Sequence, residues 1–163
     1  MRDALVVGAL GGDPVPVLAA ALTSLGEQVA TLHAYGARRF LLVNVPDVGA
    51  TPAVRMLGPV AQGFGSQLAL AYNAQLAGLR GQLMGLLPGA DIRLLDIHAT
   101  LEAVLAQPAL YGFTNTTEAC VTPGVAPYRC AHANRHVFWD GVHPTAAMHA
   151  WVARQAGAVL AAP

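Results

Sequence analysis

The stretch Arg39-Phe40-Leu41-Leu42-Val43-Asn44-Val45-Pro46 is a short, almost continuous run of apolar residues that ends at a proline. A second run of this kind is Asp91-Ile92-Arg93-Leu94-Leu95-Asp96-Ile97. Runs without polar alternation are typical of strands that are covered on both faces, as in parallel sheets. Apolar residues at helical spacing lie on either side of both runs. We therefore predict two parallel strands, with helices over residues 14–36, 60–83, 98–106 and 144–160.

Helices that alternate with strands predict βαβ connections, and hence an α/β fold with three α/β/α layers around a parallel sheet. Sheets of this kind usually have about five or six strands, so this one is short of strands. Residues 4–10 fit a strand and a helix equally well, while residues 48–59 and 108–135 are rich in turn-forming residues and are predicted as loops. Residues 1–163 are thus predicted to form a single, incomplete domain.

The composition excludes several classes of function. The chain has 9 basic and 9 acidic residues, a formal net charge of zero, and 11% charged residues. It has no basic run, which argues against binding to nucleic acid or to an anionic membrane surface. The apolar run 4–10 is short and follows Asp3, so no signal peptide is predicted there. The longest uncharged stretch, residues 56–79, is too polar to cross a membrane, and no transmembrane segment is predicted.

The chain has two cysteines, Cys120 and Cys130, which are ten positions apart. That spacing does not fit a C-x-x-C zinc or redox motif. A Pro-Gly turn between the two residues could bring the sulfur atoms together, and a disulfide closing so small a loop would contribute roughly 2–3 kcal/mol. Such a bond persists only in an oxidising compartment. Two unpaired thiols are the alternative.

Residues of catalytic type gather in Phe138-Trp139-Asp140-Gly141-Val142-His143-Pro144-Thr145. A turn at this point can bring the Asp140 carboxylate to Nδ1–H of His143, which fixes the tautomer and leaves Nε2 free as a base. A D-x-x-H pair alone also fits an N-terminal helix cap beside an ordinary histidine. The flanking Trp139, Pro144 and Thr145, together with the amphipathic helix that follows, form a much rarer combination and favour the catalytic interpretation.

With these residues the chain resembles the GDSL, or SGNH, family of esterases and lipases, and more closely its bacterial phospholipase/lecithinase/haemolysin branch. The final family block, D-x-x-H followed by P-T, matches Asp140, His143, Pro144 and Thr145. Residues 42–52 match a family segment similar to VNLPDLGATP, and residues 92–96 and the loop from Cys120 to Cys130 also match. The resemblance implies an SGNH-hydrolase fold of flavodoxin-like type, a carboxylic or lipid ester as substrate, no cofactor, and a secreted or periplasmic location.

The resemblance assigns only two members of the family's active site to this chain. It implies that Asp140 is the acid that orients His143 and that His143 is the general base. The family's nucleophilic serine follows Gly-Asp, whereas Ser24 and Ser66 lie in helical patterns without a preceding Gly-Asp, and no G-x-N-D block with an oxyanion asparagine is found. We expect the chain to be the carboxyl-terminal part of a longer enzyme. We also expect little or no esterase activity from residues 1–163 alone.

Two alternatives belong to other classes of function. The first is a zinc site, which would suit five side chains with nitrogen or carboxylate ligand atoms: His132, His136, Asp140, His143 and His149. The simpler interpretation is that these histidines are solvated loop residues. A sheet that lacks strands would instead favour an inert fragment that self-associates or complements another chain through its exposed edge. Asn44 and Asp47 follow a strand and are candidates for lining an acyl pocket, with a turn role as the alternative for Asp47.

Overall fold

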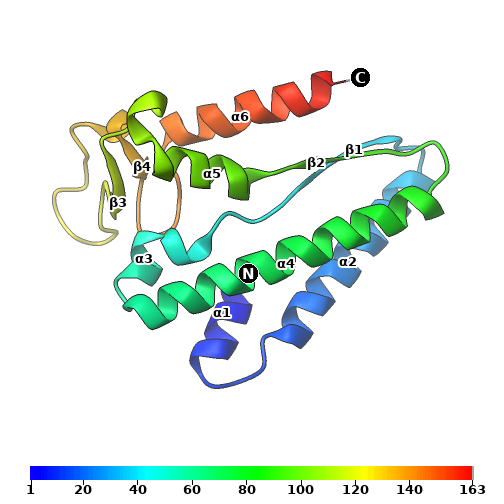
Figure 1. The fold of residues 1–163 in the computed structure, drawn as a ribbon, viewed down its shortest axis with the longest axis horizontal. Helices are drawn as coiled ribbons and strands as arrows, with labels where there is room; N and C mark the ends of the chain where they lie inside the picture. Colours follow the sequence, from blue (N-terminus) through cyan, green and yellow to red (C-terminus); the bar gives the residue numbers. More distant parts are fainter. Residues whose placement is uncertain (163) are drawn as a thin grey trace.

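Helices make up most of the chain (Figure 1). The computed structural model describes residues 1–162. All four predicted helices and both predicted strands are present, with ends that differ by a few residues. The elements in chain order are α1 (Arg2–Ala9), α2 (Val15–Ala34), β1 (Arg39–Val43), η1 (Val48–Ala50), α3 (Pro52–Arg55), α4 (Pro59–Leu86), β2 (Asp91–Leu95), α5 (Ile97–Ala106), η2 (Pro108–Tyr111), β3 (Asn115–Ala119), η3 (Ala133–Arg135), β4 (His136–Phe138) and α6 (Ala146–Ala161).

The first sheet pairs β1 with β2 in parallel, in a register that runs from Arg39 opposite Asp91 to Val43 opposite Leu95. Figure 1 shows these strands between α6 on one side and α4 with α2 on the other, and both α6 and α4 contact β2. The predicted α/β class and the parallel pairing are therefore confirmed. Within residues 1–162, β1 pairs with no strand other than β2, so its second edge is free.

The main core lies between α2, α4 and this sheet. Its buried residues come from all four elements: Leu22, Val29, Leu42, Leu76, Leu83 and Ile92. Asn73 of α4 also fastens the chain just beyond β1, because its amide donates to the carbonyl of Val45 at 2.8 Å and accepts from the Val45 N–H at 2.9 Å. The end of β1 is thus held by apolar packing and by a side chain that replaces missing strand hydrogen bonds.

A second small sheet was not predicted. The prediction placed residues 108–135 in a loop, but β3 lies within that range and pairs in parallel with β4, with Asn115 opposite His136 and Ala119 opposite Phe138. The sequence of β3, Asn-Thr-Thr-Glu-Ala, lacks the apolar alternation of a half-buried strand. Its pairing depends on β4, which is only three residues long and lies far along the chain. Local pattern therefore could not reveal it.

One ambiguous local prediction is resolved by the structure, and two others are corrected. Residues 4–10, which fitted a strand or a helix, belong mostly to α1, whose Ala4 packs against Leu18 and Leu68. The predicted loop 48–59 contains η1 and α3, and Pro52 stands in the first turn of α3, where a proline is favourable. The last helix was predicted to begin with Pro144, but Thr145 is the N-cap of α6, so Pro144 lies outside the helix.

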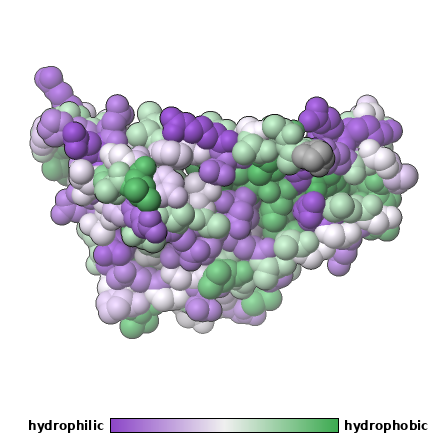
Figure 2. All heavy atoms as spheres, turned by 45° about the horizontal axis from the view of Figure 1, so that its top comes forward, coloured by the Kyte–Doolittle hydropathy of each residue, from purple (hydrophilic) through white to green (hydrophobic). Residues whose placement is uncertain are grey.

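The surface carries many apolar side chains, and Figure 2 shows apolar residues gathered in a hollow on one face. Val43 at the end of β1 is 47% exposed. By length and composition alone, α2 is the one described helix that could cross a membrane, and 17% of its most apolar window is buried. The sequence prediction considered residues 56–79 and overlooked this helix. Leu22 and Val29 of α2 belong to the main core.

Candidate active site

The loop between β4 and α6 is a tight reversal that carries Asp140 and His143. Its ends are joined by a hydrogen bond from Trp139 N–H to the His143 carbonyl at 2.8 Å and another from Thr145 N–H to the Val137 carbonyl at 2.9 Å. Within the loop, Asp140 Oδ1 accepts from the N–H groups of Val142 at 2.8 Å and His143 at 2.7 Å. An aspartate closes a turn in this way by taking the place of a backbone acceptor.

The second carboxylate oxygen of Asp140 meets the imidazole, as predicted. Asp140 Oδ2 lies 2.8 Å from His143 Nδ1. Because an ionised carboxylate only accepts hydrogen bonds, Nδ1 is the donor and the neutral ring keeps its lone pair on Nε2. The Asp140 side chain is 19% exposed and that of His143 is 75% exposed. The imidazole therefore lies at the surface while its partner carboxylate is largely covered.

The local hydrogen bonds favour the charged form of Asp140. Partial burial acts to raise the pKa of this carboxyl group, but the backbone N–H groups of His143 and Val142 and the imidazole of His143 act against it, and the pKa is lowered from its ordinary value. The carboxylate is thus ionised at neutral pH. An ionised carboxylate at this distance fixes the orientation of the ring and would stabilise an imidazolium if Nε2 took up a proton.

Three contacts fix the loop to the body of the protein. Thr145 is 1% exposed, and its hydroxyl donates to the His136 carbonyl at 2.7 Å and caps α6 by accepting from Met148 N–H at 3.3 Å. From the other side, Ala53 of α3 donates its N–H to the Gly141 carbonyl at 2.9 Å. A Cβ at Gly141 would lie 3.2 Å from Ala53 Cβ, so the close approach of α3 favours glycine there.

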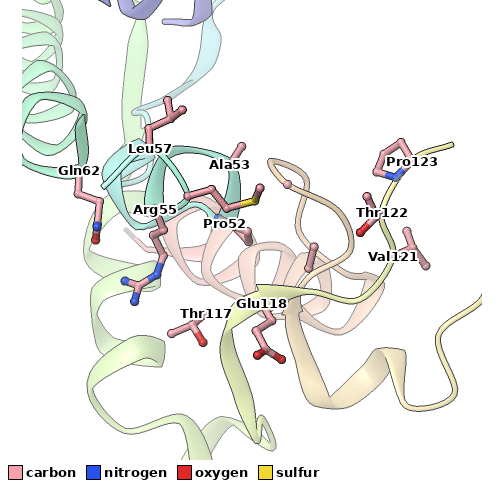
Figure 3. A pocket seen from close by; sticks show the side chains of 13 residues that line it. Pro52, Ala53, Arg55, Leu57, Gln62, Thr117, Glu118, Val121, Thr122 and Pro123 are labelled. Atoms are coloured by element: carbon pink, nitrogen blue, oxygen red, sulfur yellow. The ribbon is translucent and has the colours of Figure 1, made fainter. Parts of the chain in front are cut away.

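The loop lies between two cavities. A small apolar cavity of about 70 Å³ is lined by Val142 and Pro144, together with residues of β4, α5 and α6. A larger open cleft of about 760 Å³ extends from Gly141 along α3 and β3, and this volume falls within the range of small-molecule sites. Figure 3 shows Arg55, Thr117 and Glu118 toward one part of this cleft and Val121, Thr122 and Pro123 toward another.

The residues that follow β1 have structural roles. Asn44 donates to Asp96 Oδ1 at 2.7 Å and accepts from the N–H groups of Ile97 and His98 at 2.8 and 3.1 Å, so it joins the end of β1 to the start of α5. Asp47 Oδ1 accepts from Gly49 N–H at 2.8 Å and from the Ser66 hydroxyl at 2.7 Å. Neither Asn44 nor Asp47 lines the cleft or the apolar cavity, and the turn role considered for Asp47 is the one observed.

The two cysteines form the predicted disulfide. The five residues of the zinc alternative are not brought together: Asp140 pairs with His143, and within residues 1–162 the one group of three metal-ligating side chains is Cys120, Cys130 and His136. Sequence reasoning missed the contact of α3 with Gly141. The proline that starts α3 and the glycine at 141 were its only local signals.

Comparison with known proteins identifies the family. Residues 11–156 match the profile of the GDSL-like Lipase/Acylhydrolase family, and the chain belongs to this family. Its relatives include three proteins of Arabidopsis thaliana. The anther-specific proline-rich protein APG is 31% identical over 75% of this chain and 25% of its own length. The GDSL esterase/lipase At1g73610 is 30% identical over 79% and 38%, and the GDSL esterase/lipase At1g29660 is 28% identical over 79% and 39%.

The predicted family is thereby confirmed, and with it membership of a hydrolase family of SGNH type. The chain spans between a quarter and two fifths of the length of these three relatives. Because they are plant proteins, assignment to the bacterial branch stays a prediction.

Proposed function

We propose that Asp140 and His143 are the acid–base half of a serine-type carboxylic-ester hydrolase whose substrate is a small-molecule or lipid ester. The observation that carries the proposal is the 2.8 Å contact between Asp140 Oδ2 and His143 Nδ1. Of the loop between them, Gly141 lines the open cleft, whereas Asp140 and His143 themselves line neither the cleft nor the apolar cavity. The orientation of the pair leaves Nε2 as the accepting nitrogen. Family membership supports the reaction class.

The proposed reaction has two steps. His143 Nε2 takes the proton of a serine hydroxyl as its oxygen attacks the ester carbonyl, and Asp140 stabilises the imidazolium. The imidazolium then gives the proton to the alcohol oxygen as the ester C–O bond breaks. The alcohol departs, and the acyl group stays on the serine. Water attacks this acyl group in the same way, with His143 again as base, and the acid and the free serine are released. Neither step requires a cofactor.

The nucleophile and the oxyanion donors are expected from outside residues 1–163. The chain has two serines, of which Ser66 donates its hydroxyl to Asp47 and Ser24 lies on an exposed face of α2. The proposal therefore uses neither as the nucleophile: Ser66 is engaged with Asp47, and Ser24 lies on a different element from the Asp140–His143 loop. Loss of one oxyanion donor alone costs on the order of a hundred- to a thousand-fold in rate. We accordingly propose that the isolated chain turns over esters little or not at all.

The disulfide supports a location outside the reducing cytosol. A bond between Cys120 and Cys130 persists in secreted and periplasmic proteins and is reduced by cytosolic thiols. We therefore place the working enzyme in an oxidising compartment, in agreement with the expectation from the family resemblance.

A chimera tests the proposed roles. Residues 11–156 would replace the matching segment of the Arabidopsis GDSL esterase/lipase At1g29660, and hydrolysis of p-nitrophenyl butyrate would be measured. We expect turnover in the chimera and its loss in His143→Ala. His149→Ala is the matched control, because this histidine is exposed on α6 and belongs to neither the pair nor the two cavities beside it.

Two results would contradict the proposal: a folded chimera without turnover, or turnover that survives His143→Ala. The isolated chain provides a separate test of the missing nucleophile. If residues 1–163 alone hydrolyse the ester and His143→Ala abolishes that hydrolysis, the nucleophile lies within the chain.

The free edge of β1 supports a second candidate, a fragment that complements another chain or self-associates. Its backbone groups are not paired with a strand on that side within residues 1–162, and Val43 is 47% exposed. Such edges favour pairing with another strand. Light scattering tests self-association, since a monomer at high protein concentration argues against this form of the second candidate.

A further inference from the structure

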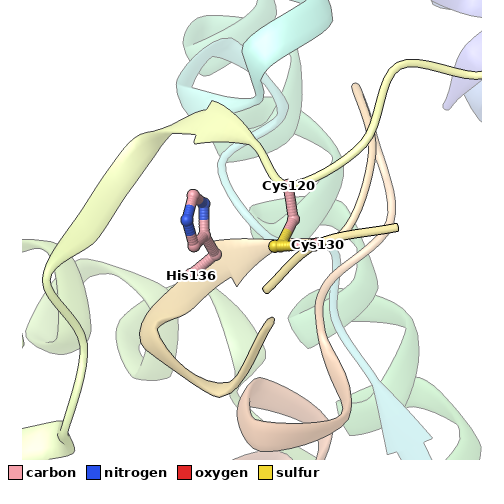
Figure 4. A group of neighbouring side chains, drawn as sticks. All are labelled: Cys120, Cys130 and His136. Atoms are coloured by element: carbon pink, nitrogen blue, oxygen red, sulfur yellow. A yellow bond between two sulfur atoms is a disulfide. The ribbon is translucent and has the colours of Figure 1, made fainter. Parts of the chain in front are cut away.

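Cys120, Cys130 and His136 form a cluster that the proposed hydrolysis does not use. Figure 4 shows the imidazole of His136 beside the two sulfur atoms. The ligand atoms of the three side chains all lie within 4.8 Å of one another, and all three residues are half-buried. Cys120 stands just after β3 and His136 opens β4, so the small second sheet brings them together.

The His136 ring is incompletely satisfied. Its Nδ1 is buried and has no hydrogen-bond partner among the described residues. A buried polar atom without a partner costs about 1–3 kcal/mol, so such an atom calls for an explanation. Nδ1 of His98 is buried without a partner as well, but among the described residues His136 is the histidine that stands in a group of metal-ligating side chains. Its imidazole is therefore placed to serve a ligand that the disulfide form does not bind.

From this cluster we infer that, before the disulfide forms or after a dithiol reduces it, Cys120, Cys130 and His136 hold a thiophilic divalent cation such as Zn²⁺. The oxidised enzyme of the proposed function would not carry this ion. Two thiolates and an imidazole are the ligand types that zinc prefers, and a fourth position stays open for water. This set differs from the zinc alternative considered from the sequence, which contained His136 but neither cysteine.

The backbone already suits such a site. Tetrahedral zinc with Zn–S bonds of 2.3 Å holds its two sulfur atoms about 3.8 Å apart. The Cα atoms of Cys120 and Cys130 are 5.4 Å apart, a separation at which rotation of the two side chains can provide that spacing. Hydrogen bonds from Cys120 N–H to the Phe138 carbonyl at 3.1 Å and from Val121 N–H to the Trp139 carbonyl at 2.8 Å keep β3 against β4 without the disulfide.

The chemical steps balance with a dithiol as the reductant. The dithiol transfers two electrons and two protons to the disulfide, which becomes two thiols while the dithiol becomes a cyclic disulfide. Zn²⁺ then replaces the two thiol protons, which pass to solvent, and neutral His136 supplies its lone pair. The cation would replace the covalent link between the loop 121–131 and the sheet that leads into Asp140.

The test is metal binding by the whole chain in its reduced and oxidised forms. After reduction by a water-soluble phosphine, Co²⁺ is added as a spectroscopic probe, and Zn²⁺ affinity is measured by competition with a chromogenic chelator. We expect one ion per reduced chain, a thiolate-to-cobalt charge-transfer band, and no such band in the oxidised chain. His136→Ala should weaken Zn²⁺ binding by at least 10- to 100-fold.

His132→Ala is the matched control, because His132 is an exposed histidine nearby that is outside the cluster. It should leave affinity unchanged. Equal affinity of the oxidised and reduced chains, a cobalt spectrum without the thiolate band, or an unchanged affinity in His136→Ala would overturn the inference. If a variant fails to fold by circular dichroism, the unmodified chain still decides: Zn²⁺ must slow alkylation of its reduced thiols, and an unchanged rate overturns the inference.

Discussion

The two ends of the molecule stabilise themselves in different ways. In the region of α2, β1, α4 and β2, long regular elements pack apolar faces together. The side chains of Asn73 and Asp47 hydrogen-bond to the backbone of the segment that follows β1. In the region of β3, β4 and α6, the strands are short and irregular. There an aspartate turn, a threonine cap and a disulfide supplement a second apolar cluster.

The two regions also differ in which aspartate has a partner suited to acid–base chemistry. Asp96 and Asp140 both follow strands and accept backbone N–H groups, but the side-chain partner of Asp96 is the amide of Asn44, which neither gains nor loses a proton near neutral pH. The second interaction of Asp140 is with an imidazole whose other nitrogen faces solvent. A partner side chain that can take up a proton separates the candidate site from a structural copy of the same motif.

Replacing each of the two aspartates in the chimera should give the largest difference, one variant losing turnover and the other losing stability. Asp140→Asn loses the acceptor for Nδ1–H and should lower kcat for p-nitrophenyl butyrate on the order of 10⁴-fold. Asp96→Asn should lower the melting temperature and leave kcat nearly unchanged. Equal effects of the two changes on kcat would show that Asp140 acts only as a structural cap.

The apolar region should respond in stability. Leu76 is fully buried in the main core, and Leu76→Ala in the isolated chain should cost about 2–5 kcal/mol of unfolding free energy, measured by urea denaturation. On the same helix, Leu86 is 73% exposed, and Leu86→Ala should change stability by no more than about 0.5 kcal/mol. Similar costs at both positions would contradict the packing described for α4.

The threonine cap should have a smaller effect. Thr145→Ala removes the acceptor for Met148 N–H and the donor to the His136 carbonyl, and it should cost about 0.5–2 kcal/mol in urea denaturation. Thr145→Ser keeps the hydroxyl and should retain most of that stability. If serine proves no better than alanine, the methyl group rather than the hydroxyl is what stabilises the helix start.

Acid should give the mildest effect. For Asp96 and Asp140 partial burial acts to raise the pKa, but backbone and side-chain hydrogen bonds outweigh it and lower the pKa in the folded protein. Their contribution to stability is therefore complete above the unfolded value, near 3.9, and is lost as the pH falls through that value toward the lower folded pKa. Each Asp→Asn variant should flatten the fall in unfolding free energy below about pH 5, and an unchanged slope contradicts the assigned direction.

Sequence patterns predicted the elements with strong local signals. The apolar runs of β1 and β2 and the helical spacing of α2, α4 and α6 are visible within each segment. By contrast, β3 and β4 have little apolar pattern and exist because they pair with each other across the loop 120–135. A prediction from local periodicity cannot include that pairing energy.

The candidate site was predictable only in part. The spacing of Asp140 and His143 was enough to foresee their contact, because a three-residue turn can be closed locally. The docking of Ala53 on Gly141 joins residues far apart in the sequence, and the roles of Asn44 and Asp47 depend on Asp96 and Ser66 in other elements. These contacts require the tertiary structure.

The tautomer of His143 provides the most direct test that its ring is held by Asp140. Nuclear magnetic resonance of the isolated chain with isotope-labelled histidine reports which ring nitrogen carries the proton, and His143→Gln identifies the signal. We predict a proton on Nδ1 at neutral pH, with a low-field resonance that disappears in Asp140→Asn. A neutral ring protonated on Nε2, or a spectrum that Asp140→Asn leaves unchanged, would contradict the account.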